Sequence, residues 1–297
     1  MPVKYAELLK TVTNIIHGAW QVDFNLTVES FSLHIAGVRS LVNFSALSTW
    51  GAEVFFLSSV GAVANWQALS GLPRNIPEET FADWRVPDDT GYAQSKFISE
   101  CLLDVASKES GIPSVICRIG QIAGPTAQTC AWPKKEWLPS LIRSSKHIGK
   151  LPKSLGRLDV IDWVPVNLVA QCILELAIRS RSKRRGSGAL VYHVINPERS
   201  TWLELLPCAE RLLGIQETVP LEAWLEALRE SASQTADLTQ NPGVKLLDFF
   251  NSLGTSNGSV GSVNLSTTHT MEMSRTQMEL GPVRSEWLEN WIRQWGF

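Results

Sequence analysis

The sequence is poor in cysteine, and the cysteines that it has stand apart. There are five of them, an odd number, scattered along the chain without a C-x-x-C pair. Disulfide frameworks need paired cysteines, and the common zinc sites need ligands at close, regular spacing. The pattern therefore argues against both, and small buried side chains are the expected role. No metal site is predicted.

The chain also lacks an excess of charge of one sign. Its formal net charge is −2 and its pI is about 6.2. Binding to nucleic acid or to an anionic membrane depends on many clustered Lys and Arg side chains. The one basic run, residues 179–185, follows a helical stretch and is interpreted as a solvated helix end. Neither nucleic acid nor a membrane is an expected partner.

Long apolar runs are absent as well. None reaches the roughly 18–20 residues that a membrane helix requires, and residues 1–10 lack the apolar centre of a signal peptide. We therefore expect a cytoplasmic protein. With 297 residues, of which 44% are hydrophobic and 19% charged, the chain is long and apolar enough to bury a sizeable core.

Short apolar runs alternate with helical stretches over the first two thirds of the sequence. Runs of strand length, partly β-branched, lie at residues 13–17, 53–57, 114–118 and 189–195. Helical patterns lie between them, at residues 28–45, 92–108 and 168–179. Strands that alternate with crossover helices form a parallel sheet covered by helices on both faces. The predicted fold class is α/β, a Rossmann-like parallel sheet.

After about residue 198 the pattern becomes mainly helical. Residues 201–213 and 220–231 have the periodicity of amphipathic helices. Residues 251–268 are rich in Ser, Gly and Asn, which is typical of a mobile surface loop. We predict two parts, a partial Rossmann-like core at residues 1–198 and a smaller helical substrate subdomain at residues 199–297.

Three residues carry the chemistry that the sequence suggests. Tyr92 and Lys96 form a Y-x-x-x-K pattern, which puts both side chains on one face of a helix. Ser59 follows a predicted strand, at the carboxyl edge where parallel sheets place their sites. A tyrosine with a pKa of about 10 needs a nearby cation to act as an acid or base at neutral pH. A serine hydroxyl can hold a carbonyl oxygen. The alternative is a surface helix with an exposed Tyr and Lys, and a Ser that caps a turn.

Two further positions remain ambiguous from the residues alone. Gly120 and Gly124 follow the predicted strand at residues 114–118 and suit a tight turn in which the backbone approaches a ligand. An ordinary turn explains them equally well. His17 is interpreted, from its sequence context, as a core or turn histidine.

The chain resembles the thioester reductase domains of fungal adenylate-forming reductases and of hybrid peptide–polyketide synthetases, members of the extended short-chain dehydrogenase/reductase superfamily. The resemblance rests on IIHGAWQVDFN (15–25), GVRSLVNFS (37–45), VFFLSSVGAV (54–63), GYAQSKFISE (91–100) and CRIGQIAGP (117–125). It continues through DVIDWVPVNLVA (159–170), YHVINP (192–197), VKLLDFF (244–250) and the Trp-rich end. It therefore covers nearly all of the chain.

The resemblance also implies roles for individual residues. It implies that Ser59, Tyr92 and Lys96 are the catalytic trio, with Lys96 also touching the nicotinamide ribose. It implies a cofactor wall formed by His17, Gly18 and Ala19. It further implies a border of the nicotinamide and substrate pocket formed by Arg118, Gly120, Gln121 and Ile122.

The start of the chain departs from this family. Such domains begin with a strand, a G-x-x-G-x-x-G turn and a helix that bind the pyrophosphate. Here a short helix, residues 3–10, precedes the first strand, and no glycine precedes Gly18. We therefore expect a truncated sheet and no cofactor, with the cofactor-type positions vestigial or pocket-lining. The apolar sheet edge is expected to be covered in a homodimer, by the serine-rich loop, or by a separate N-terminal half.

Three functions follow from these expectations. The first is an enzyme of natural-product biosynthesis that acts on a carbonyl-rich polyketide or peptide intermediate by cofactor-independent acid/base chemistry, such as cyclisation, condensation or isomerisation. The second is an NADPH-dependent thioester or aldehyde reductase that works as a fragment or as half of a complex. The third is a non-catalytic partner of a carrier protein or synthetase. The sequence alone favours the first and identifies no substrate.

Overall fold

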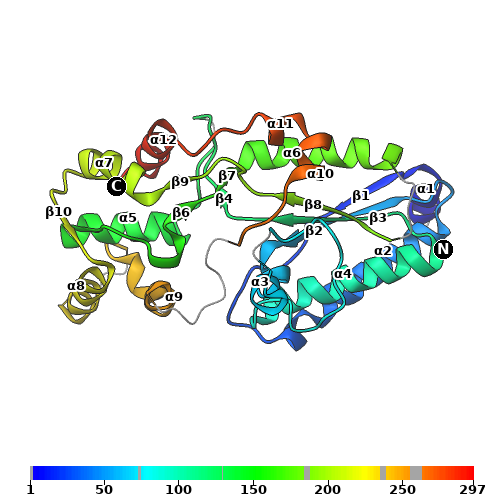
Figure 1. Ribbon diagram of the computed structural model, residues 1–297, viewed down its shortest axis with the longest axis horizontal. Helices are drawn as coiled ribbons and strands as arrows, with labels where there is room; N and C mark the ends of the chain where they lie inside the picture. The colour runs from blue at the N-terminus through cyan, green and yellow to red at the C-terminus, as the bar shows by residue number, and fades with distance from the viewer. Residues whose placement is uncertain (1–2, 73–74, 129, 184–187, 235–238, 255–262) are drawn as a thin grey trace. The chain divides into compact units, whose positions relative to one another are not determined.

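The computed structural model describes residues 3–72, 75–128, 130–183, 188–234, 239–254 and 263–297 (Figure 1). The chain divides into two compact units. Unit 1 comprises Met1–Gly120, Ala170–Ile195 and Val263–Glu279, and unit 2 comprises Gln121–Val169, Asn196–Ser262 and Leu280–Phe297. Both units are discontinuous and cross residue 198, because the chain returns to unit 1 after residue 262. The predicted division at residues 1–198 and 199–297 remains a prediction about domains.

Unit 1 is built on a parallel sheet with the strand order β1–β2–β3–β8. Its strands are β1 (Asn14–His17), β2 (Glu53–Ser59), β3 (Ser114–Ile119) and β8 (Leu190–Val194). The central strands β2 and β3 are almost continuously buried, as expected when helices cover both faces of a parallel sheet. This confirms the predicted α/β fold class. β1 and β8 are the two edge strands of this sheet in the described part of the chain.

Helices cover both faces of this sheet (Figure 1). One face packs against α2 (Ser32–Leu47) and α4 (Gly91–Ser110), and the other lies under α6 (Val166–Arg179). Thr90 caps the start of α4, where its hydroxyl accepts the Ala93 amide hydrogen, and Gly111 caps the end with a left-handed φ of 64°. Unit 1 also contains α1 (Val3–Thr11), η1 (Val28–Phe31), η2 (Val60–Val63), α3 (Trp66–Ser70), α10 (Thr268–Met273) and α11 (Arg275–Met278). α4 thus runs from the carboxyl edge of the sheet.

Unit 2 is mainly helical. Its helices are α5 (Trp137–Ile148), α7 (Trp202–Leu213), α8 (Leu221–Gln234), α9 (Leu247–Leu253) and α12 (Ser285–Trp295). Its strands form three short pairs: β4 (Ile122–Ala123) with β7 (Val164–Pro165), β5 (Lys150–Pro152) with β10 (Glu217–Val219), and β6 (Val160–Ile161) with β9 (Ser200–Thr201). The short 3-10 helices are η3 (Gly156–Leu158) and η5 (Pro242–Leu246). η4 (Ser180–Lys183) instead follows α6 in unit 1.

Two predicted surface segments fall partly outside the described residues. These are residues 255–262 of the serine-rich segment and residues 184–185 of the basic run. The two ends of the serine-rich segment are ordered. Residues 251–253 complete α9, and Leu265, which is 5% exposed, pairs with Ile76 in a β-bridge.

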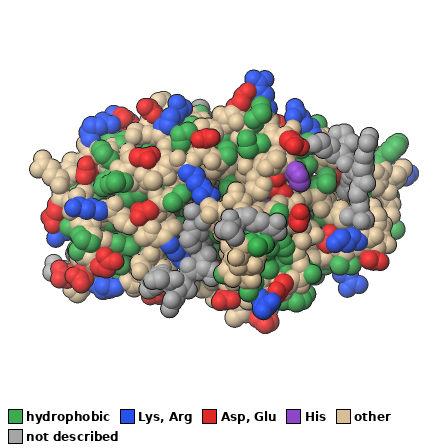
Figure 2. All heavy atoms as spheres, viewed as in Figure 1, with side chains coloured by type: hydrophobic (Ala, Val, Ile, Leu, Met, Phe, Trp, Pro, Cys, Tyr) green, Lys and Arg blue, Asp and Glu red, His purple; other side chains and the backbone are tan. Residues whose placement is uncertain are grey.

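The surface agrees with the near-neutral composition. Figure 2 shows basic and acidic side chains interspersed on the face that it draws. Among the described residues, no helix has the length and apolarity to cross a membrane.

Candidate active site

Ser59, Tyr92 and Lys96 meet at the carboxyl edge of the sheet. Ser59 ends β2, and Tyr92 and Lys96 lie one turn apart at the start of α4. The Ser59 side chain hydrogen-bonds Tyr92 and also accepts the Gly61 amide hydrogen at 3.2 Å. The Lys96 amine lies 5.7 Å from the centre of the Tyr92 ring. The structure brings the three residues together, and their catalytic role stays a prediction.

Lys96 is buried, with only 3% of its surface exposed. Its amine donates to the Leu57 carbonyl at 2.7 Å and lies 4.3 Å from the Trp20 ring centre and 4.8 Å from that of Phe56. Burial lowers the pKa of Lys96 to about 7, while the Glu100 carboxylate acts in the opposite direction. The amine can therefore both hold and release a proton near neutral pH.

Tyr92 is held as a neutral phenol. Burial raises the pKa of Tyr92, and the hydrogen bond with Ser59 offsets only part of this effect. The rings of Phe24 and Phe31 meet the Tyr92 ring edge-on, with centroids at 5.1 and 6.2 Å. Burial disfavours the charged forms of both side chains, and the expectation that Lys96 stabilises the phenolate stays a prediction. Tyr92 is thereby suited to donate a proton.

The residues predicted as a cofactor wall lie beside this trio. His17 ends β1 and stacks on Phe56 at 6.0 Å between ring centroids. Its Nε2 atom is buried and has no hydrogen-bond partner among the described residues. Burial lowers the pKa of His17, and Lys96 adds to the effect. Gly18 and Ala19 follow in the exposed turn.

The other predicted pocket residues lie elsewhere. Arg118 has 0% of its surface exposed, so it offers no wall to a ligand. At Gly120, a Cβ atom would come within 2.7 Å of Ile195, so this glycine permits close packing. Gln121 and Ile122 belong to unit 2, where Gln121 accepts the indole hydrogen of Trp137 at 3.1 Å. The structure does not assign these two residues to the site in unit 1.

Two neighbours of Lys96 were missed by the sequence reasoning. Trp20 covers the amine, and its indole donates to the Ser95 hydroxyl at 3.3 Å. Glu100 is 2% exposed and follows Lys96 by one helical turn. The spacing of 92, 96 and 100 places all three side chains on one face of α4, and this signal could have revealed Glu100.

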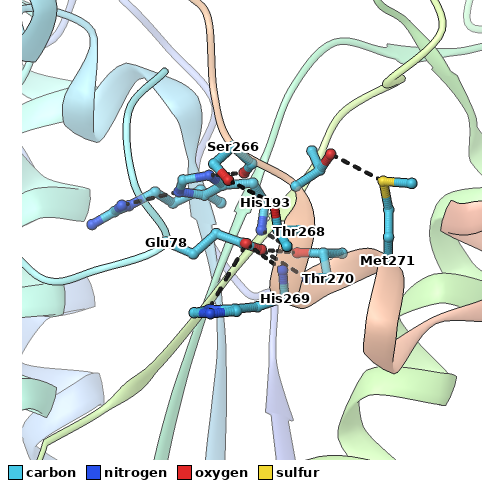
Figure 3. Close-up of polar contacts among 9 residues, drawn as sticks. Glu78, His193, Ser266, Thr268, His269, Thr270 and Met271 are labelled. Carbon is cyan, nitrogen blue, oxygen red and sulfur yellow. Dashed lines mark hydrogen bonds and ion pairs between the residues drawn. The ribbon is translucent and has the colours of Figure 1, made fainter. Parts of the chain in front are cut away.

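A buried polar network extends from Glu100 across the sheet. The Arg118 guanidinium donates to both Glu100 oxygens, from Nε at 3.1 Å and from Nη2 at 2.7 Å. Its Nη1 atom lies 3.1 Å from Nε2 of His193 on β8. The His193 amide donates to the Thr270 hydroxyl at 2.8 Å, and that hydroxyl donates to Glu78 at 2.5 Å (Figure 3). The network therefore joins α4, β3, β8 and α10.

The residues at this edge of the sheet leave polar atoms free for a nicotinamide group. The Lys96 ammonium has three N–H donors and makes one hydrogen bond within the described residues, to Leu57. His17 Nε2 adds an unpaired nitrogen nearby. These polar atoms fit the hydroxyl-rich nicotinamide ribose. Among the described residues, no group of His, Cys, Asp and Glu side chains is arranged to hold a metal ion.

Comparisons with known proteins identify the family of the chain. A model of NAD-binding domains described as male sterility protein matches residues 2–173. A carboxylic acid reductase of Neurospora crassa is 40% identical over 100% of this chain and 28% of its own length. Adenylate-forming reductase Nps10 of Heterobasidion annosum is 33% identical over 83% of this chain and 22% of its own length. The chain thus spans about a quarter of the length of these relatives.

Solved structures show the same fold. The terminal R domain of the myxalamid PKS-NRPS pathway has a TM-score of 0.76 at 22% identity, over 99% of this chain and 70% of that one. The UDP-glucose 4-epimerase of Thermus thermophilus, solved with NAD, has a TM-score of 0.53 at 18% identity, over 96% of this chain and 78% of that one.

The expectation of no cofactor is wrong. The matching family model describes NAD-binding domains, and a structural neighbour holds NAD. The expectation rested on the lack of a glycine-rich turn before β1, which concerns only the pyrophosphate end of a dinucleotide site. The nicotinamide end depends on other residues, at the carboxyl edge of the sheet.

Proposed function

Because this chain belongs to the NAD-binding family described as male sterility protein, we propose that it is a nicotinamide-dependent reductase of natural-product biosynthesis that reduces a carrier-bound thioester to an aldehyde. The observation that carries the proposal is that Ser59 pairs with Tyr92, whose ring centre lies 5.7 Å from the buried Lys96 amine. A proton donor, an oxygen-binding hydroxyl and a titrating amine are what carbonyl reduction requires of a protein.

Each residue of the trio has a distinct task in this reaction. The cofactor, when bound, supplies the hydride that reaches the carbonyl carbon. Tyr92 donates its phenolic proton to the carbonyl oxygen, since burial keeps the phenol neutral. Ser59 holds that oxygen by a hydrogen bond as its negative charge develops. Lys96, with a pKa of about 7, supplies the proton that restores the phenol. The hemithioacetal formed in this way then breaks its C–S bond: its hydroxyl proton passes to the departing carrier thiolate, the C=O bond forms, and the products are the aldehyde and the free carrier thiol.

The residues that would hold the cofactor lie on both sides of Lys96. The remaining N–H donors of Lys96 and the Nε2 atom of His17 would bind the nicotinamide ribose. Gly18 and Ala19 would form the adjoining wall, because they follow β1 at the same edge. His17 would be a neutral acceptor or donor, since burial lowers its pKa.

The substrate class is proposed from the relatives. One similar structure comes from a PKS-NRPS pathway, another is a thiolation-reductase di-domain of a non-ribosomal peptide synthetase, and the relatives include a carboxylic acid reductase and an adenylate-forming reductase. A synthetase carrier domain is therefore the proposed partner, and its thioester the proposed substrate. A homodimer and a cytoplasmic location remain predictions. No observation favours cofactor-independent cyclisation, condensation or isomerisation over reduction, and the proximity of Ser59, Tyr92 and Lys96 disfavours a non-catalytic binding role.

The test offers the full chain an acyl-pantetheine thioester and NADPH, and measures NADPH oxidation together with the aldehyde formed. We expect aldehyde from the wild-type protein and a loss of about 10²–10⁴ in rate for Tyr92→Phe. Tyr5→Phe is the matched control, because Tyr5 lies on α1 against Phe44. Aldehyde formation that persists undiminished in Tyr92→Phe would overturn the proposal.

A further inference from the structure

Glu100 is the buried carboxylate that acts electrostatically on the Lys96 amine. It lies one turn along α4 from Lys96, on the same helix face, and the two groups interact electrostatically. In a buried site, such a carboxylate would normally act as the counter-ion of the lysine. Yet the Lys96 amine donates to the Leu57 carbonyl instead.

The Glu100 carboxylate is bound by other groups. Both of its oxygens accept hydrogen bonds from Arg118, and Oε1 also accepts the Ser58 hydroxyl hydrogen at 2.5 Å. The side chains of Arg118 and Glu100 are 0% and 3% exposed, so water does not compete for this pair. The two-point geometry of guanidinium and carboxylate is the strongest ion pairing available to Glu100.

His193 holds Arg118 from the opposite side. A guanidinium only donates, so the Nε2 atom of His193 must accept, and the ring proton must lie on Nδ1. Nδ1 then donates to the Ser266 carbonyl at 2.7 Å (Figure 3). Burial lowers the pKa of His193 well below its usual value, with Arg118 adding to the effect. The neutral histidine therefore fixes the guanidinium without taking over its charge.

We propose that Arg118 is a positioning residue for Lys96. By binding both oxygens of Glu100, Arg118 keeps this carboxylate from pairing with the lysine amine, which stays free to exchange a proton at the site. The inference deepens the proposed function and rests on it for the catalytic role of Lys96. The Arg118 charge, held against Glu100, opposes the field of the carboxylate at Lys96 and leaves only part of it, whereas the carboxylate alone would act in full.

The other groups that face Lys96 do not supply a substitute counter-ion. His17 on β1 and Tyr92 on α4 are neutral at pH 7, because burial disfavours their charged forms. Phe56 on β2 and Trp20 after β1 present ring faces. Among the titratable groups of the described residues that face the amine, Glu100 is therefore the one anion, and Arg118 controls its effect.

The test removes each charge of the pair singly and then both together, and measures the pKa of Lys96 in each protein. The pKa comes from an NMR titration of ¹³C-lysine-labelled protein. Lys96→Arg identifies the Lys96 resonance by its disappearance. Arg118→Met should raise the pKa of Lys96 by about one pH unit, because Glu100 loses its cation. Glu100→Gln should lower it by about one pH unit, because a lone cation remains. The double variant should return within roughly 0.3 pH unit of the wild type. The pH–rate profile should move in the same directions.

A purely structural pair would change stability but leave the titration of Lys96 in place, and unchanged titrations in both single variants would overturn the proposal. If the single variants do not fold, the wild-type titration decides, since a Lys96 that titrates above about pH 9 is not deprived of its counter-ion. His193→Asn, which keeps an acceptor for Arg118, is the control without a charge change. The titration needs neither cofactor nor thioester. A protein that shows these pKa shifts but reduces no thioester would refute the proposed function alone.

Discussion

Units 1 and 2 bury different kinds of side chain. Among the described residues, the buried charged side chains all belong to unit 1: Glu53, Glu78, Lys96, Glu100, Asp104 and Arg118. Most of the twelve tryptophans belong to unit 2, and the fully buried ones pack there as a single cluster of Trp132, Trp163, Trp202, Trp224, Trp291 and Trp295. The core of unit 1 thus contains buried charged side chains, whereas the core of unit 2 contains a cluster of buried tryptophans.

The two cores have different physical purposes. A buried indole contributes a large apolar area once its N–H group is paired, and Trp202, Trp291 and Trp295 each donate to a backbone carbonyl at 2.9–3.1 Å. Buried charge contributes little net stability, because desolvation offsets the attraction between the charges. We therefore expect the buried tryptophans of unit 2 to contribute more to the free energy of unfolding than the buried charged groups of unit 1.

The largest expected effect tests the aromatic core. Trp291→Ala should lower the free energy of unfolding by about 3–5 kcal/mol, because Trp291 is fully buried against Trp132 and Trp163. Denaturant unfolding followed by circular dichroism gives the value. Trp50→Ala, at a site that is 61% exposed, should cost less than about 1 kcal/mol. A Trp291 variant of normal stability but reduced catalytic rate would break the division between the units.

The next effect concerns a buried carboxylate of unit 1. Glu78 accepts the amide hydrogens of His269 and Thr270 at 2.6 and 2.8 Å, as Figure 3 shows. Glu78→Gln should cost about 2 kcal/mol, because an amide NH₂ then faces a donor. Amide exchange should accelerate in residues 268–273. Exchange that stays slow there would show that α10 does not depend on this carboxylate.

A smaller effect appears in the pH dependence of stability. Lys96 has a pKa of about 7 in the folded protein, below the 10.5 of an exposed lysine, so the unfolded chain binds more protons between these values. Stability should therefore rise by about 1.5 kcal/mol from pH 7 to about pH 8.5, before the buried cysteines act in the opposite direction. Lys96→Met should flatten this rise. An equal rise in the variant would assign it to other groups.

The smallest effect concerns glycines outside both cores. A Cβ atom at Gly37, within α2, would meet no atom within 4 Å, so Gly37→Ala should raise stability by roughly 0.5–1 kcal/mol. Gly71 is equally open but has a φ of 63°, so Gly71→Ala should lower stability. Thermal unfolding of the two variants separates backbone strain from packing. Shifts of the same sign would contradict this explanation.

The sequence predicted the elements whose signal is local. Residues 53–57 and 114–118 are apolar and partly β-branched, which matches strands buried on both faces. The i, i+4 spacing of Tyr92 and Lys96 predicted a shared helix face, and Ser59 followed from its place after a strand. In each case, neighbours in sequence are neighbours in space.

The features that the sequence did not predict depend on distant contacts. Glu100 and Arg118 are 18 residues apart, and Arg118 and His193 are 75 residues apart. The resemblance implied a pocket border at Arg118, whereas its side chain contacts Glu100 and His193 inside the core, and a strand pattern does not say what a polar residue meets there. The cofactor was missed for a related reason, since a motif at one end of a dinucleotide site says nothing of the other end.

The discontinuity of unit 1 imposes an order on synthesis. The ribosome delivers Glu78 192 residues before its partner Thr270. At about 5–20 residues per second, the carboxylate waits roughly 10–40 s for that hydroxyl. During this interval the segment Asn196–Ser262 of unit 2 is made. The nascent sheet therefore lacks the segment that carries α10 until residues 263–279 have been made.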